Sequence, residues 1–214
     1  MNRRIFLKSA AAGCGITGGG LFNIGVTRAA TLPASGPNII GPREGFSPQI
    51  GTLVSMLEWM RRAVVDAVQG FTIADLDYLP DSKANTIGAL LLHLAATERH
   101  YQIHTFEAKK WNEWDEETRK QWDVPARLGV EARRTIKGNE LHYYLDALRQ
   151  VRERTITEFR NRDDAWLMQI DEHWPWGPTN NYCKWFHVCE HESHHKGQIA
   201  WIKARLSSSR QNTN

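Results

Sequence analysis

The stretch CEHESHHKGQIAW, residues 189–201, places three histidines within five positions, at His191, His194 and His195. It lies inside a longer segment, residues 180–206, whose apolar side chains recur at the three- and four-residue spacings of an amphipathic helix. On such a helix His191 and His195 share one face and lie about 6 Å apart. Because two imidazoles at that separation can share one divalent ion, the stretch predicts a long helix that carries two metal ligands.

The same residues match the His-Glu-x-x-His pattern of zinc proteases, at His191, Glu192 and His195. In the protease families that carry this pattern, a third ligand follows it as Glu, His or Asp. After His195 the chain reads KGQIAWIKARLSSSRQNTN, which contains none of these residue types. We therefore exclude a zinc protease and expect any third ligand to come from upstream. Glu192 points to a different helix face from His191, so we do not assign it as a catalytic base.

Three further segments show helical periodicity, at residues 47–69, about 85–106 and about 139–161. With residues 180–206 they predict an all-α protein built as a four-helix bundle. The connection at 109–138 is about 30 residues long, several times the usual bundle loop. Such a length can return the chain along the full bundle, which predicts an up-down-down-up order.

His93 is the strongest upstream candidate for a third ligand, because it lies in the apolar run ALLLHLAA of the second helix. A histidine in such a run is expected to be buried, and buried polar groups need partners. Helix rise places His93 about 12 Å, and His191 and His195 roughly 15–24 Å, from the end that the two helices share. These depths are compatible with a three-imidazole site. His187, one turn before His191, remains the main competing ligand.

Residues 85–102, NTIGALLLHLAATERHYQ, followed by residues 185–203, WFHVCEHESHHKGQIAWIK, resemble the DinB/YfiT-like superfamily of metal-binding four-helix bundles. The specific parts are the histidine of the first segment and the His-x-x-x-His-x-Gly-Gln-Ile pattern of the second. The resemblance implies an up-down-down-up bundle that binds a divalent metal, zinc or nickel, through His93, His191 and His195. It also implies chemistry such as thiol-dependent group transfer.

Two functions remain open at this stage. An open three-histidine site predicts a metal-dependent hydrolase or transferase that acts on a small, partly apolar molecule. A site saturated by a further ligand, such as His187 or Glu98, predicts instead a non-catalytic metal-binding or stress protein with a structural ion. A haem or di-iron bundle is disfavoured, because Cys-x-x-Cys-His is absent and Glu-x-x-His occurs once, at Glu192 and His195.

The long connections are rich in tryptophan, which allows two interpretations. The rings either cover the ends of the bundle or line the mouth of a pocket over its core. The residues concerned are Trp111, Trp114, Trp122, Trp166, Trp174 and Trp176.

Residues 1–29 resemble a twin-arginine export signal, with Arg3 and Arg4 before a weakly apolar, glycine-rich run. The glycines interrupt the run of roughly 20 apolar residues that a membrane span needs, so we expect no stable span after signal removal. This predicts export to the periplasm. Residues 30–46 are expected to form a linker or arm, residues 47–207 the bundle, and residues 208–214 a disordered tail.

The net charge of the chain bears on whether it binds nucleic acid. The chain has 27 Lys and Arg against 24 Asp and Glu, and residues 1–29 hold four of the bases and no acids. The remainder therefore has 23 bases against 24 acids, which argues against nucleic acid as a partner.

Cys183 and Cys189 are six residues apart on one helix, too far for a disulfide, and are expected to be free thiols. The sequence leaves a homodimer open.

Overall fold

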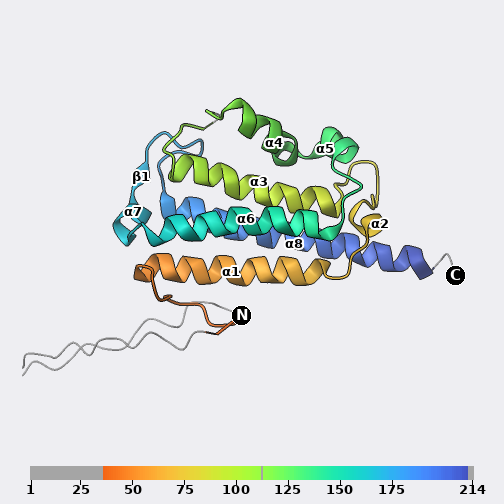
Figure 1. The fold of residues 1–214 in the computed structure, drawn as a ribbon, viewed down its shortest axis with the longest axis horizontal. Coiled ribbons are helices and arrows are strands. Elements are labelled where there is room, and N and C mark those ends of the chain that lie inside the picture. The colour runs from red at the N-terminus through yellow and green to blue at the C-terminus, as the bar shows by residue number, and fades with distance from the viewer. Residues whose placement is uncertain (1–35, 112, 212–214) are drawn as a thin grey trace, which may run out of the picture. The chain divides into compact units, whose positions relative to one another are not determined.

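The computed structural model describes residues 36–111 and 113–211, and within these it is almost entirely helical. The expected export signal at 1–29 and the first residues of the arm lie outside the described residues. Four long helices form the bundle (Figure 1): α1 (Pro48–Val68), α3 (Ile87–Thr105), α6 (Leu141–Arg160) and α8 (Asn181–Gln211). They correspond to the four predicted segments, which confirms the all-α fold.

Contacts and hydrogen bonds between the helices establish the direction in which each helix runs (Figure 1). Helices α3 and α6 run parallel, because Gly88 lies against Tyr144 near both starts and Gln102 donates to Thr155 further along both. Helix α8 runs antiparallel to α3, since Trp185 near its start donates to Thr105 at the end of α3.

Helix α1 runs parallel to α8, because Arg61 bonds to Glu192 and, further along both helices, Lys203 bonds to the Ala67 carbonyl. The order is therefore up-down-down-up, as predicted.

The long connection between α3 and α6 contains two helices that the sequence analysis did not predict, α4 (Glu116–Arg127) and α5 (Gly129–Thr135). Helix α4 is strongly charged and contains Pro125, so apolar periodicity does not reveal it. The residue that could have revealed the start of α4 in the sequence is Asp115, a favourable N-cap whose side chain accepts from the Thr118 amide. Helix α4 lies along α3 (Figure 1) and covers the face that carries His93.

The remaining elements are short. Helix α2 (Ile73–Leu76) begins with a capping box formed by Thr72 and Asp75. After α6 come α7 (Asp164–Met168) and a two-residue hairpin, β1 (Ile170–Asp171) and β2 (Thr179–Asn180), whose strands pair antiparallel.

Two predicted boundaries need correction. Helix α3, expected to start at about residue 85, is capped by Thr86, whose side chain accepts from the Ala89 amide, whereas Asn85 accepts from the Gly129 amide. Helix α8 continues to Gln211, so helical structure extends past the expected start of the tail at 208. Residues 212–214 lie outside the described part of the chain.

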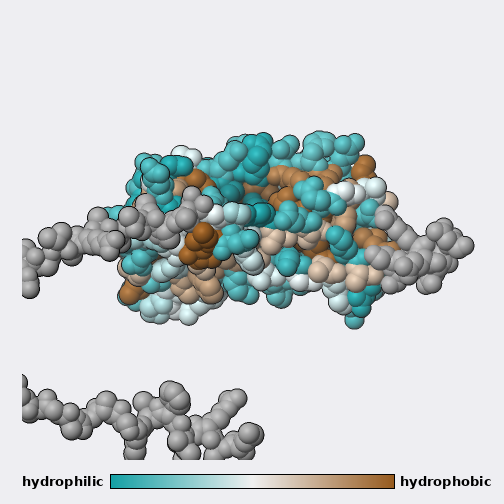
Figure 2. All heavy atoms as spheres, turned by 90° about the horizontal axis from the view of Figure 1, so that it is seen from below, coloured by the Kyte–Doolittle hydropathy of each residue, from teal (hydrophilic) through white to brown (hydrophobic). Residues whose placement is uncertain are grey.

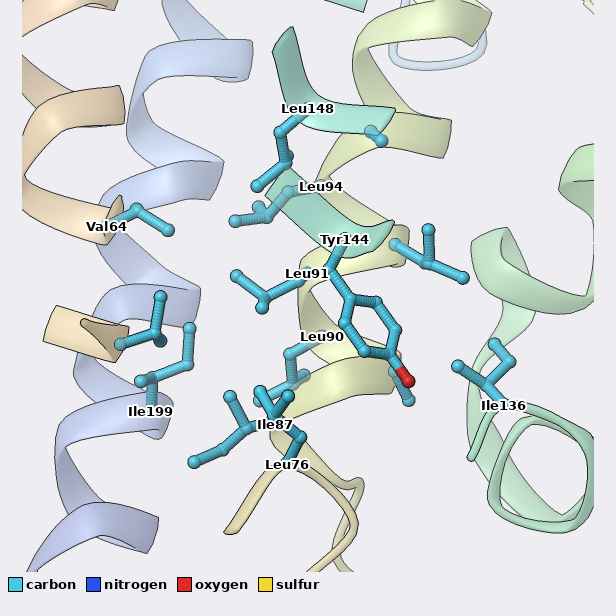
Figure 3. Packing of buried hydrophobic residues seen from close by; sticks show 14 of the residues in the cluster. Val64, Leu76, Ile87, Leu90, Leu91, Leu94, Ile136, Tyr144, Leu148 and Ile199 are labelled. Atoms are coloured by element: carbon cyan, nitrogen blue, oxygen red, sulfur yellow. The ribbon is translucent and has the colours of Figure 1, made fainter. Parts of the chain in front are cut away.

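Apolar side chains from all four long helices fill the interior (Figure 3). Leu91 and Leu94 of α3 point toward Val64 of α1 and Ile199 of α8, and Leu148 of α6 lies above Leu94. Each of these side chains is at most 2% exposed.

The face in Figure 2 is mostly hydrophilic, with hydrophobic residues between the polar ones. No helix in the described residues is long and apolar enough to cross a membrane.

Four charged side chains, one from each long helix, meet inside the apolar core. Glu98 of α3 accepts from Arg61 of α1 at 2.7 Å and from Arg152 of α6 at 2.8 Å. Glu192 of α8 accepts from the same two arginines, at 2.6 and 2.7 Å. We call these four residues the charge cluster; its formal charge is zero.

Candidate metal centre

Helices α3 and α8 bring His93, His191 and His195 together. The Nε2 atom of His191 lies 2.8 Å from Nε2 of His93 and 3.1 Å from Nε2 of His195. The i,i+4 spacing puts His191 and His195 on one face of α8. The antiparallel crossing of α3 brings His93 against them. The three could hold one metal ion, because one ligand atom from each lies within 4.8 Å of the others.

Hydrogen bonds on the far side of two rings determine where their lone pairs point. Nδ1 of His93 lies 3.0 Å from the Pro125 carbonyl, which can only accept, so this nitrogen carries the proton. Nδ1 of His195 donates in the same way to Oε1 of Gln198 at 3.0 Å. The Nε2 atoms of His93 and His195 therefore carry lone pairs, and both lie within 3.1 Å of Nε2 of His191. Such contacts orient metal-binding histidines.

The local environment keeps the three rings neutral. Burial, together with the neighbouring imidazoles, lowers the pKa of His191 to about 3 and the pKa of His195 to about 4. Burial also lowers the pKa of His93, although its bond to the Pro125 carbonyl opposes this. Neutral imidazole is the form that binds metals, so the rings are ready to act as ligands near pH 7.

The donor set fits a divalent metal ion. Nitrogen ligands about 2.0–2.1 Å from a tetrahedral zinc lie about 3.3 Å from one another. The two Nε2 separations that His191 makes here, 2.8 and 3.1 Å, need only small outward shifts to reach that value. Among the described residues the group contains three ligands, which leaves a coordination position for a small molecule.

The two residues considered as additional ligands have other partners. Nδ1 of His187 lies 2.7 Å from the Tyr101 hydroxyl, and the His187 ring centroid is 5.3 Å from that of His191. Glu98 belongs to the charge cluster, where two arginines bind its carboxylate. The structure therefore does not support either residue as a fourth ligand. The neighbouring His194 is exposed.

A pocket of about 390 Å³ opens beside His191. Aromatic side chains dominate its walls, and the other lining residues are Thr97 of α3 and Arg119, Asp123, Ala126 and Arg127 of α4. The ring-bearing residues are His100, Tyr101, Trp111, Trp114, Trp176, His187 and His191. The histidine group thus lies at the edge of a pocket of the size that small ligands occupy.

The tryptophans of the connections divide between the two interpretations. Trp111, Trp114 and Trp176 line this pocket, as the pocket interpretation predicted. Trp122 and Trp174 are 8% and 5% exposed and belong to the apolar core.

His100 and His104, which follow His93 on α3, both stack on tryptophans. The His100 ring is 4.0 Å from Trp114 with an interplanar angle of 4°, and the His104 ring is 4.6 Å from Trp111. These contacts attach the loop after α3 to the helix that carries His93.

The model of the mycothiol-S-transferase family matches residues 52–207, which contain all of α3 and α6, all but the first four residues of α1, all but the last four of α8, and all three histidines of the group. This family is a member of the DinB/YfiT-like superfamily that the sequence resembles. No curated protein matches the chain.

Proposed function

The chain belongs to the mycothiol-S-transferase family, and from this premise we propose that it is a metal-dependent transferase that joins a low-molecular-weight thiol to a small electrophile. In the proposed reaction the thiol loses its proton, its sulfur forms a bond to carbon, and the electrophile releases its leaving group, which takes up the proton. The family favours transfer over hydrolysis. The observation that carries the proposal is the convergence of three neutral imidazoles beside an aromatic pocket.

The residues of the chain have separate parts in this proposal. His93, His191 and His195 would hold the divalent ion, zinc or nickel. A bound ion supplies a Lewis acid that lowers the pKa of a thiol. Pro125 and Gln198 keep two of the ligand rings oriented through their Nδ1 atoms.

The three-ligand arrangement favours a catalytic site over a purely structural one. A structural zinc site is closed by four protein ligands, whereas a catalytic site has three and keeps one position for water or substrate. Here three ligands come together among the described residues, and the pocket reaches one of them, His191.

Metal analysis tests the site. We expect about one equivalent of zinc or nickel in the purified protein, and loss of that metal in His93→Ala and in His191→Ala, because either change removes one of three ligands. His142→Ala is the matched control, since its side chain is 73% exposed and lies outside the group. Circular dichroism checks that each variant is folded. Full metal occupancy in both ligand variants would contradict the assignment.

Activity is the second arm of this experiment. Conjugation of a thiol to a chromogenic electrophile should require the metal and return when the metal is added back to chelated protein. A protein that binds metal through the three histidines yet shows no conjugation with any low-molecular-weight thiol would support the structural alternative.

We also propose that the protein is exported through the twin-arginine pathway, on the basis of Arg3 and Arg4. Replacing both by lysine should keep the protein in the cytoplasm, because twin-arginine signals depend on that pair. Fractionation of cells that express the full chain measures this. Equal periplasmic amounts of wild type and double variant would contradict the proposal.

A further inference from the structure

Two consecutive histidines of α8 bond to opposite ends of one side-chain amide, that of Gln198. The amide oxygen Oε1 lies 3.0 Å from Nδ1 of His195, and the amide nitrogen Nε2 lies 3.0 Å from Nε2 of His194. Spacings of three and four residues allow both contacts along a single helix. His194 is exposed and lies outside the group of three histidines that could hold a metal.

The chemistry of the amide determines the direction of both hydrogen bonds. The nitrogen of a glutamine side chain can only donate, so Nε2 of His194 accepts and carries a lone pair. The oxygen can only accept, so Nδ1 of His195 donates, which leaves the lone pair of this ring on Nε2. We call His194, Gln198 and His195 the imidazole–amide relay.

The orientation of this amide decides which nitrogen of His195 has the proton. A glutamine amide turned by 180° exchanges its oxygen and its nitrogen. The nitrogen would then face Nδ1 of His195, which would have to accept and to hold its proton on Nε2, the atom needed for the metal. His194 opposes this turn, because the turned amide would bring its oxygen against the lone pair on Nε2 of His194.

We propose that His194 is a positioning residue for the metal centre: it accepts from Gln198, keeps the amide oxygen against His195, and so keeps the proton of His195 on Nδ1. This inference rests on the proposed function in one respect, namely that Nε2 of His195 binds the metal. The relay itself can be observed in metal-free protein, because it consists of the chain's own side chains.

Nitrogen-15 NMR of metal-free protein with labelled histidines tests the relay, because each imidazole nitrogen has a different chemical shift with and without its proton. At pH 8 both His194 and His195 should hold the proton on Nδ1. In His194→Leu, which cannot accept a hydrogen bond, the fraction of His195 with its proton on Nε2 should rise. A proton on Nε2 of His194 in the wild type, or no change at His195 in His194→Leu, would overturn the proposal.

Zinc affinity shows whether His194 acts through Gln198. His194→Leu should weaken zinc binding by about threefold to tenfold, the effect of one hydrogen bond. The same change should have no effect in Gln198→Ala, where the amide is missing. An equal loss in both backgrounds would mean that His194 acts without the amide, and would overturn the proposal.

Two further variants complete the affinity measurements. His194→Gln should keep most of the zinc affinity, because its own amide oxygen can accept from Gln198. Ser193→Leu is the matched control and should bind zinc like the wild type, because Ser193 is exposed on the same helix and takes part in neither bond of the relay. A loss in His194→Gln as large as in His194→Leu would contradict the acceptor role.

Failure of this inference can be told apart from failure of the proposed function. Zinc bound by the three histidines, with the same loss on His194→Leu in both backgrounds, contradicts the inference alone. A proton on Nδ1 of His195 that depends on His194, in a protein that takes up no metal, contradicts the proposed function and leaves the relay standing.

Discussion

His93 and His195 owe their orientation to one hydrogen bond each, and the two acceptors differ in how far away they lie in the sequence. Gln198 is three residues after His195 on the same helix, a spacing that lets the two side chains meet without any other segment. Pro125 is 32 residues after His93 and meets it only because α4 folds back along α3. The orientation of the His195 ring thus depends on a neighbour on its own helix, whereas that of the His93 ring depends on a residue of a separate helix.

Replacing Gln198 by Ala removes the acceptor that holds His195. We expect metal affinity to fall by about 10- to 100-fold, because the ring loses its fixed tautomer and orientation. Competition with a chromogenic chelator measures the change. His142→Ala is the control, since its side chain is 73% exposed and lies outside the histidine group. Wild-type affinity in Gln198→Ala would show that the bond does not orient the ligand.

Helix α3 packs closely on α6 because Gly88 has no side chain. A Cβ atom at this position would lie 2.7 Å from the Tyr144 ring, which is completely buried. At Gly197 of α8, by contrast, an added Cβ would meet nothing within 4 Å, so close packing does not require a glycine there. The two helical glycines therefore differ in what they permit.

Gly88→Ala should lower the free energy of unfolding by about 1–3 kcal/mol, because the added methyl group forces α3 and α6 apart. Gly197→Ala should leave it unchanged or raise it by up to about 1 kcal/mol, since alanine is the better helix former. Urea denaturation of both variants measures the difference. Equal stabilities of the two would refute this account of the α3–α6 contact.

The charge cluster connects all four long helices at the centre of the bundle. Each arginine also donates to a carbonyl of the helix opposite: Arg61 to Leu148 and Arg152 to Leu57. Burial by itself would raise the pKa of Glu98, but the charges and hydrogen bonds of Arg152 and Arg61 outweigh it and hold the pKa at about 2. Folding and the ionisation of Glu98 are therefore linked.

The sign of this linkage makes the protein less stable in acid. Glu98 has a lower pKa when folded than when unfolded, so its contribution is complete above about pH 4.5 and is lost as pH falls toward 2. Between pH 6 and pH 3, the free energy of unfolding should fall by about 2 kcal/mol more in wild type than in Glu98→Gln.

Urea denaturation at the two pH values measures this, and the comparison removes the effect of histidines that protonate in the same interval. Glu153→Gln, which changes an exposed carboxylate of α6, should behave like wild type. An equal loss in wild type and Glu98→Gln would contradict the linkage.

Local spacing along the chain was enough for much of this description. The three- and four-residue periodicity predicted the four long helices, the length of residues 109–138 predicted their order, and the i,i+4 spacing put His191 and His195 on one face. The approach of His93 to them was predicted from its depth on the helix, and the structure brings the three together. Their binding of a metal stays a prediction.

Contacts between segments that are distant in the sequence could not be predicted from spacing along the chain. Periodicity says which face of a helix is apolar, but not how neighbouring helices are rotated and offset, and those two quantities set side-chain contacts. The partner of His187, the ring walls beside His191 and the pairing of Glu98 and Glu192 with two arginines all depend on them. Spacing along the chain therefore predicted the helices and the candidate ligands, while the packing of helices and connections produced the pocket and the charge cluster.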